Sequence, residues 1–472
     1  MSNYKKTIGI EVHVELKTNN KIFSPSLNHY GNMANTSVNV IDLGYPGTLP
    51  IFNIDVLKVA IKACHVLNLD ITNNMHFDRK NYFYPDNPKN FQITQFNTPI
   101  GRNGYIEITK KNGEKKKIEI LEAHMEEDTC KSVHGEKTSL LDFNRAGVPL
   151  LEIVTKPCIH DSEEAVLYLE KLRELLLYSD VSDCKIEEGS MRCDANISIS
   201  DTDVLGTKVE VKNIGSITNV GLAIDYEANR QSEVLEQGEK VIEETRRYDD
   251  KNNKTISMRV KETGNDYRYF PEPDLPNLVI DDNFISDCLS DLKTMPDVRR
   301  EKYKKALINE ININKIIQNK EISDYLENFE NINLVIASNL LLGDISSYLN
   351  KNNKSIYDTK LTCDKFLELV NKLESEEISN KIFKDILEEL METEKSVSEI
   401  IKEKGISLVS DEGQIRSFII GVLENNAKLV DDYRNGNERA SKALMGQVMK
   451  ESRGSVAPNL ANKILMEILN EK

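Results

Sequence analysis

The segment TIGIEVHVEL at residues 7–16 constrains the fold of this chain more than any other segment does. Apolar and charged side chains alternate along it, which is the pattern of a β-strand with one buried and one polar face. The polar face carries Glu11, His13 and Glu15. Residues two apart on a strand are spaced by roughly 7 Å, so neighbouring side chains can converge on one ion. Alternation is also the pattern of an ordinary strand with a solvated face, and this segment alone leaves both interpretations open.

Two further segments, residues 189–200 and 208–216, repeat the division into an apolar and a charged face. A third segment, residues 124–134, places the acidic run Glu126-Glu127-Asp128 between histidines, although such a run is usually only a solvated face. The charged residues of the three segments include Glu126, Glu127, Asp128, Arg192, Asp194, Lys208, Glu210 and Lys212. If these strands share a sheet with residues 7–16, their charged faces form one platform.

The side chains on this predicted platform suit a magnesium site that works on phosphates. Mg²⁺ prefers oxygen ligands and often shares its shell with substrate phosphates. The bases Arg192, Lys208 and Lys212 are candidates to bind phosphate oxygens, as in an ATP site. Neither GxxxxGK[ST] nor GxGxxG occurs, so no standard nucleotide loop explains the use of ATP. The pattern therefore predicts phosphoryl transfer without a P-loop.

Charge and cysteine content exclude several other classes of protein. The formal net charge is −16, whereas a simple nucleic-acid coat protein is usually basic, so any RNA contacts must be local or shared with a partner. Seven scattered cysteines without a CxxC pair support neither a disulfide framework nor a cysteine zinc site. No stretch approaches the roughly 18 apolar residues of a membrane span, and the N-terminus has no apolar signal core. We therefore expect a cytoplasmic protein.

The order of the segments predicts an α+β fold in three parts. Residues 1–294 hold most of the Gly, Pro and aromatic residues and predict a large mixed α/β domain with an antiparallel-rich sheet. Helices are expected inside it at 161–179, capped by Asp161, and at 221–239. Helical periodicity then predicts an all-helical domain at 295–404 and a small helical tail domain at 405–472.

Basic and aromatic residues are interleaved in two segments, residues 77–96 and 258–276. Such mixtures can stack bases and hold the backbone of single-stranded RNA. The candidate RNA contacts in these segments, in ETRRYDD and in the tail are Arg79, Lys80, Arg246, Arg247, Arg259, Lys261, Arg268, Lys450 and Arg453. In the alternative interpretation the aromatic rings anchor the core, and the basic residues pair with acids or lie on the surface.

The same segments resemble the family of B subunits of the aspartyl/glutamyl-tRNA amidotransferases. The matching stretches are IGIEVHVELKT, DRKNYFYPDNPKNFQITQ, HMEEDTCKSVH, DFNRAGVPLLEIVTKP, EEGSMRCDANISI, ETRRYDD and MRVKETGNDYRYFPEPDLP. The tail is similar to that of the family through GQVMKESRG and APNLANKIL. The resemblance covers nearly the whole chain, and the motifs are too long and irregular for chance agreement.

The resemblance implies a cradle domain, a helical domain and a tRNA-binding tail. It also implies a carbon–nitrogen ligase in which ATP and Mg²⁺ phosphorylate the side-chain carboxylate of Glu-tRNA(Gln) or Asp-tRNA(Asn). Ammonia then displaces the phosphate to give the amide. The implied partners are an amidase-like A subunit that releases ammonia from glutamine and a small C subunit, together forming a heterotrimer.

The family's metal ligands carry over onto six residues of this sequence. They are Glu11, His13, Glu126, Glu127, Asp194 and Glu210. We expect Glu11, His13 and Glu127 to be catalytic and to hold one ion. A regular strand would instead group Glu126 with His124 and Asp128, so a bend in the chain would have to bring Glu127 to the metal.

The chain departs from the family where many members hold zinc with cysteines. The corresponding positions here are Ser24, Ser26, Asn39 and Asp42. Hydroxyl and amide groups are poor zinc ligands, so we expect no structural zinc and a loop held by its own packing.

Two other functions remain open from the residues alone. One is a stand-alone Mg²⁺/ATP-dependent ligase of a small acid. The other is an RNA-binding adaptor whose carboxylates hold a purely structural ion.

Overall fold

The computed structural model of this chain describes residues 4–135, 137–260, 267–405, 412–434, 437, 439–452, 456 and 458–470. The chain divides into two compact units, Met1–Pro296 and Asp297–Lys472. The predicted α+β class is confirmed, since the first unit is built on a large, mostly antiparallel sheet and the second is helical. The predicted separation of residues 295–404 from 405–472 stays a prediction, because both parts fall in the second unit.

A nine-stranded sheet forms the centre of the first unit. Its strands, in spatial order, are β14 (Lys254–Val260), β13 (Glu244–Asp249), β12 (Val209–Lys212), β11 (Met191–Ser200), β1 (Lys5–Glu15), β10 (Pro149–Thr155), β7 (Lys115–Glu127), β6 (Gly101–Thr109) and β2 (Asp70–Ile71). Only the β12–β13 pair is parallel among the described strands of this sheet. The strand predicted from residues 7–16 is therefore an interior strand, with neighbours on both sides.

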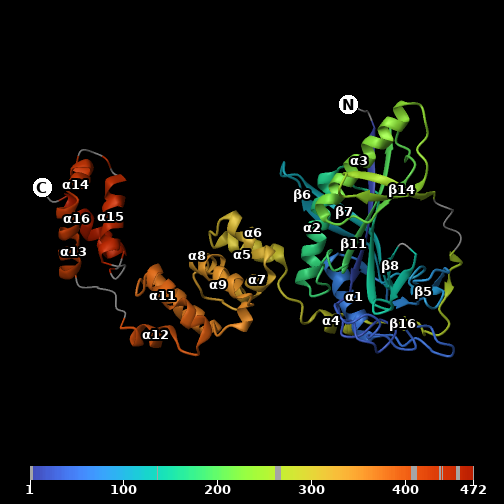
Figure 1. Cartoon of the computed structure of the whole chain (residues 1–472), viewed down its shortest axis with the longest axis horizontal. Helices are drawn as coiled ribbons and strands as arrows, with labels where there is room; N and C mark the ends of the chain where they lie inside the picture. The colour runs from blue at the N-terminus through green and yellow to red at the C-terminus, as the bar shows by residue number, and fades with distance from the viewer. Residues whose placement is uncertain are drawn as a thin grey trace. The chain divides into compact units, whose positions relative to one another are not determined.

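The two faces of β1 have opposite environments. Ile8, Ile10, Val12 and Val14 are fully buried in the main hydrophobic core. Two helices, α2 (Ser162–Tyr178) and α3 (Ile217–Glu236), cover this apolar face of the sheet (Figure 1) and add their own buried residues to the same core. The charged face is therefore turned away from the helices, and it holds the site described below.

Smaller elements complete the first unit. Three small sheets consist of β15 (Phe270–Pro271), β4 (Asp78–Asn81) and β5 (Phe91–Thr94), of β16 (Leu278–Val279) and β3 (Asn74–Met75), and of β8 (Lys131–His134) and β9 (Ser139–Asp142). Among the described residues of this unit, the other helices are α1 (Ile54–Val66) and α4 (Asp282–Leu289).

The positions that correspond to the family's zinc cysteines gather around one carboxylate. Asp42 accepts hydrogen bonds from the hydroxyl groups of Ser24, at 2.6 Å, and Ser26, and from the backbone N–H of Asn39. The buried ammonium group of Lys21 lies 3.3 Å from the same carboxylate. Hydroxyl groups, and a carboxylate that is already paired with an ammonium group, are poor ligands for zinc. These residues therefore do not fit a zinc site.

The second unit consists of helices in its described residues. They are α5 (Pro296–Lys305), α6 (Glu310–Gln318), α7 (Lys320–Leu326), α8 (Leu334–Leu340), η2 (Leu341–Ile345), α9 (Ser346–Asn352), η3 (Ile356–Asp358), α10 (Cys363–Glu374), α11 (Asn380–Glu392), α12 (Val397–Glu403), α13 (Glu412–Asn425), α14 (Ala427–Arg434), α15 (Arg439–Glu451) and α16 (Pro458–Asn470). Residues of α13, α15 and α16 form a hydrophobic core of their own. Within the described residues, no helix has both the length and the apolar character needed to cross a membrane.

Candidate active site formed by carboxylates and histidines

Strand pairing brings acidic residues to both sides of β1. In the antiparallel register, His13 lies opposite Glu152 of β10, and Glu11 lies opposite Asp194 of β11. Because directly opposed residues project to the same face of a sheet, these side chains share the polar face. Separate segments of the sequence therefore contribute to one cluster.

The first ligand group consists of His13, Glu126 and Glu152. The Nε2 atom of His13 lies 3.3 Å from a carboxylate oxygen of Glu152 and 3.5 Å from one of Glu126. The Nε2 atom of His124 lies 2.9 Å from the same oxygen of Glu152. One ligand atom from each member of the group lies within 4.8 Å of the others, close enough to hold one ion.

The second ligand group consists of Glu11, Asp194 and Glu210, whose ligand atoms also lie within 4.8 Å of one another. The ammonium group of Lys212 lies 2.9 Å from Asp194 and 3.3 Å from Glu210. The amide of Asn196 donates to Glu11 at 2.7 Å. Lys212 therefore pairs with the carboxylates of the second group, whereas His13 and His124 pair with Glu152 in the first.

The pKa values in the two groups reflect the crowding of negative charge. Burial raises the pKa of Glu11, and the nearby carboxylates of Glu152, Glu210 and Asp194 raise it further. Burial alone would raise the pKa of Glu152 as well, but His124 and His13 hold it well below its usual value. Burial would lower the pKa of His124, yet Glu152 and Glu126 raise it to about 9. The cluster thus favours positive charge, as a site for a divalent cation does.

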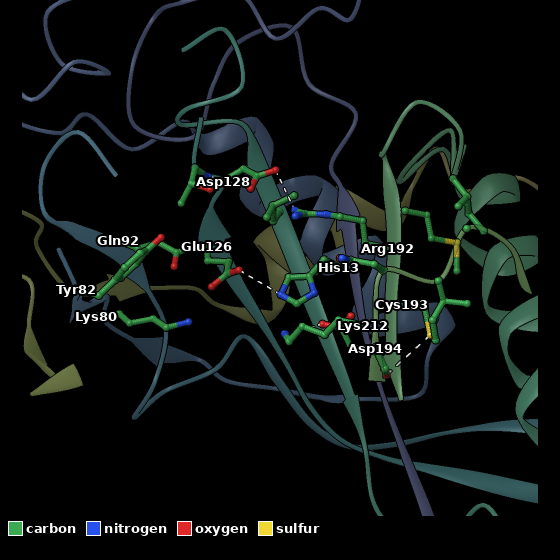
Figure 2. Close-up of a pocket in the computed structure, with 17 residues that line it drawn as sticks. His13, Lys80, Tyr82, Gln92, Glu126, Asp128, Arg192, Cys193, Asp194 and Lys212 are labelled. Atoms are coloured by element: carbon green, nitrogen blue, oxygen red, sulfur yellow. Dashed lines mark hydrogen bonds and ion pairs between the residues drawn. The ribbon is translucent and has the colours of Figure 1, made fainter. Parts of the chain in front are cut away.

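A cavity of about 540 Å³ opens beside both groups. His13, Glu126 and Asp194 lie along it, as Figure 2 shows. Arg192 also lines the cavity, and its Nη2 donates to the buried carboxylate of Asp128 at 2.9 Å. This ion pair fixes the guanidinium group next to the cavity, where the group can meet an anion.

The comparisons with known proteins identify the family of this chain. The family model of the GatB/GatE catalytic domain matches residues 6–286, and that of the GatB domain matches residues 323–469. The chain belongs to the GatB family. It is 46% identical, over the full length of both chains, to the B subunit of the aspartyl/glutamyl-tRNA(Asn/Gln) amidotransferase of Halalkalibacterium halodurans. It is 47% identical to the protein of the same name from Lysinibacillus sphaericus, over 98% of this chain and 99% of that one.

We expected Glu11, His13 and Glu127 to hold one ion, but Glu11 and His13 belong to different ligand groups and Glu127 belongs to neither. Glu126 faces the cavity, whereas the carboxylate of Glu127 is paired with Lys89 and accepts from the backbone N–H of Ile93. The bend needed to bring Glu127 to the metal is therefore not found. The regular strand alternation considered as the alternative holds, and it brings Glu126 to His13.

The sequence interpretation missed Glu152, the residue that joins the two histidines. It is the only charged residue in the strand PLLEIVT, whose other residues are apolar except for one threonine. A single carboxylate in an otherwise apolar interior strand is the signal that could have identified it, because burying a charge is costly unless it has a partner.

Of the three residues predicted to contact phosphate, two lie at the cavity. Arg192 and Lys212 line the cavity. Lys208 is exposed just before β12 and is not among the described residues that line it.

The predicted RNA contacts divide into internal and exposed residues. Arg79 is bound by Glu272 and Asp274, and Arg246 by Glu244 and Thr255, so both hold parts of the fold together. Lys80 instead lines the cavity. Arg247, Arg268 and Lys450 are exposed. Arg259 lies in β14 opposite Thr245, and Lys261 and Arg453 lie outside the described residues.

The donor set of the first group fits magnesium. Two carboxylates and one imidazole, with no thiolate, are ligands for a hard or borderline divalent ion. Mn²⁺ is a suitable probe for the same set, because it accepts both oxygen and imidazole ligands.

Proposed function

We propose that this chain is the subunit of a tRNA-dependent amidotransferase that activates a misacylated aminoacyl-tRNA with ATP and Mg²⁺. Its membership of the GatB family and the names of its relatives support the amidotransferase role. The observation that carries the activation step is the grouping of His13, Glu126 and Glu152 beside a cavity lined by Arg192 and Lys212.

The chemistry requires activation because a carboxylate is a poor acyl donor. In the proposed step an oxygen of the substrate carboxylate attacks the γ-phosphorus of ATP. The bond between this phosphorus and the bridging oxygen breaks, and ADP leaves with the electron pair. A bound Mg²⁺ would neutralise charge on the phosphates during this transfer.

The protein's own residues position the reactants. His13, Glu126 and Glu152 would hold the ion, with Glu11, Asp194 and Glu210 next to them. Arg192, fixed by Asp128, and Lys212 would donate hydrogen bonds to phosphate oxygens. The resulting acyl phosphate reacts with ammonia, which forms the amide and releases phosphate.

The proposal includes two protein partners. An amidase-like A subunit would release ammonia from glutamine, and a small C subunit would complete a heterotrimer. The substrate is Glu-tRNA(Gln), Asp-tRNA(Asn) or both, in line with the names of the relatives. The reaction takes place in the cytoplasm under this proposal.

The test is ATP hydrolysis by the reconstituted complex. Glu-tRNA(Gln) should stimulate hydrolysis, and free glutamate should not. Glu126→Gln should reduce the stimulated rate by at least about 100-fold, because loss of an electrostatic contact of this kind costs that much in other enzymes. Equal stimulation by free glutamate would favour the stand-alone ligase. Unchanged turnover in the Glu126→Gln variant would favour the adaptor with a structural ion.

A further inference from the structure

One exposed segment of the first unit is almost free of charged residues. Between residues 22 and 54, Asp42 is the only Asp, Glu, Lys or Arg, whereas 29% of the whole chain is charged. Asp42 itself is buried and is paired with Lys21. The side chains that this segment turns to solvent therefore include no carboxylate, ammonium or guanidinium group.

The same segment exposes large apolar side chains. Residues 22–53, all of which the structure describes, form neither a helix nor a strand and are the blue loops at the lower edge of the first unit in Figure 1. Five of its apolar residues are each more than half exposed, namely Leu27, Met33, Tyr45, Leu49 and Ile51. Single apolar residues are ordinary on a protein surface, but several in one uncharged segment mark a site of interaction.

Hydrogen bonds hold the parts of this segment together. The backbone N–H of Ile51 donates to the carbonyl oxygen of Phe23 at 2.9 Å, and that of Tyr45 donates to the carbonyl oxygen of Val40 at 3.0 Å. The hydrogen bonds to Asp42 described above join the two halves of the segment. The exposed apolar side chains therefore stand on a preorganised surface, which lowers the entropy cost of binding.

The composition of this surface distinguishes between classes of partner. RNA is held through its phosphates by Lys and Arg, and the segment has neither. Segments that lie on a membrane surface are usually amphipathic helices with basic residues, which the segment also lacks. Depletion of charge and enrichment in Tyr and Met are typical of the core of an interface between proteins, which takes roughly 20–30 residues from each side. The surface therefore fits a protein partner with an apolar, uncharged face.

The position of the segment indicates which partner this is. Gly44 packs against the loop before β5, where a Cβ atom built on Gly44 would lie 3.0 Å from the side chain of Lys89. Lys89 is paired with Glu127, the neighbour of Glu126 in β7. A protein bound to the segment is therefore close to the candidate site. Ammonia reaches the site without loss to water only if the subunit that releases it binds close by.

Resting on the function proposed above, we propose that residues 22–54 form the docking surface for the amidase-like subunit. Tyr45, Leu49 and Ile51 pack against an apolar face of that subunit, and the buried pair of Asp42 and Lys21 keeps the surface in shape from within.

The experiment measures the Kd of the full chain for the purified amidase-like subunit of the same organism by biolayer interferometry. Ile51→Asp should raise the Kd by at least about 30-fold, because the interface would then bury a charge without a partner. Tyr45→Ala should raise the Kd by about tenfold through the loss of an aromatic anchor. Ile51→Leu keeps an apolar side chain of the same volume and should stay within about threefold of the wild type.

Val204 provides a matched control. It is 75% exposed and lies between β11 and β12, outside the segment. Val204→Asp should keep the Kd of the wild type. Because Ile51→Asp and Val204→Asp both replace exposed side chains, thermal unfolding of both variants, followed by circular dichroism, should match that of the wild type.

Equal Kd values for Ile51→Asp and Val204→Asp would overturn the docking surface. Three other effects of Ile51→Asp would also overturn it, if binding of the amidase-like subunit is unchanged: loss of binding to the small subunit, dissociation of a dimer of this chain in light scattering, or loss of binding to phosphatidylglycerol vesicles. The measurement uses neither ATP nor tRNA, so these results leave the proposed activation step standing.

The two proposals can also fail in the opposite order. If the Kd values change as expected but Glu-tRNA(Gln) does not stimulate ATP hydrolysis, the activation step fails and the docking surface stands. If the wild type does not bind the amidase-like subunit at all, the docking surface and the proposed complex fail together.

Discussion

At the scale of single residues, Glu126 and Glu127 show how much the surroundings of a carboxylate differ between adjacent positions of a strand. Both are nearly buried, at 3% and 6% exposure. Glu126 lies against His13 at the cavity, whereas Glu127 is paired with Lys89 on the other side of β7. Burial raises the pKa of Glu127 even though Lys89 opposes the change. Neighbouring residues of the same type are therefore suited to different tasks.

This difference predicts how the two carboxylates affect metal binding. Glu126→Gln should weaken binding of Mn²⁺ by more than about tenfold, since changes around a metal commonly cost 10- to 100-fold in affinity. Glu152→Gln should have a similar effect, because Glu152 belongs to the same group. Glu127→Gln should leave the affinity within about twofold. Electron paramagnetic resonance of free Mn²⁺ measures all three, and a larger loss for Glu127→Gln than for Glu126→Gln would contradict the assignment.

At the scale of elements, the start of α2 shows how the covering helices are attached to the sheet. The Asp161 side chain caps the helix by accepting from the backbone N–H of Glu164. The carboxylate of Glu164 in turn accepts from Lys116 at 2.7 Å, from Lys110 at 3.1 Å and from the backbone N–H of His160. Lys116 belongs to β7, which also carries Glu126, so this contact helps to fix the helix on the sheet that positions the site.

These contacts predict a dependence of stability on pH. Burial would raise the pKa of Glu164, but Lys116, the His160 amide and Lys110 hold it below its ordinary value of 4.5. Because the folded pKa is depressed, the stabilisation is complete above about pH 4.5 and is lost as the pH falls through the folded pKa. Glu164→Gln should therefore lower the free energy of unfolding at pH 7 by about 1.5–3 kcal/mol, the range for hydrogen bonds to charged groups. The substitution should also reduce the difference between the free energies of unfolding measured at pH 7 and at pH 3.

Urea unfolding followed by circular dichroism at both pH values measures this effect. Glu170 is an exposed residue of the same helix and provides the control. Glu170→Gln should change the free energy of unfolding by less than about 0.5 kcal/mol. Equal losses for the two variants at pH 7 would refute a specific role for Glu164.

At the scale of the whole molecule, the candidate site and the helical region belong to different units of the chain. Both ligand groups and the cavity beside them are formed by residues of the first unit, Met1–Pro296. The second unit contains helices, and those of the tail have a hydrophobic core of their own. The family models divide the chain in a similar way, at 6–286 and 323–469. The first unit has a hydrophobic core of its own, as a domain that folds by itself does.

We expect a fragment of residues 1–296 to fold alone and to bind Mn²⁺ within about threefold of the affinity of the full chain, because domains with their own core usually fold independently. Circular dichroism would report its folding, and electron paramagnetic resonance its metal affinity. The fragment should bind tRNA more weakly than the full chain does, as the proposed role of the tail requires. An unfolded fragment, or one without metal affinity, would show that the site depends on the second unit.

Much of the architecture could be predicted from the sequence because its signals are local. Alternation at residues 7–16 predicted β1 with its charged face, and Asp161 predicted the start of α2. Strand periodicity and helix capping depend on residues a few positions apart, so they can be recognised without the rest of the chain. The same reasoning placed Glu11, Asp194 and Glu210 on polar strand faces, where the structure brings them together.

The partners of these side chains were decided only by the tertiary structure. Pairing β10 between β1 and β7 brought Glu152 to His13 and His124, and strands β4 and β5 supplied Lys80 and the residues around Glu127. Arg246 likewise donates hydrogen bonds to Glu244 of its own strand and to Thr255 of the neighbouring strand. Which strands become neighbours, and in which register, depends on burying apolar faces from distant parts of the chain together. Local periodicity thus determined which side chains face the site, and long-range packing determined which of them meet.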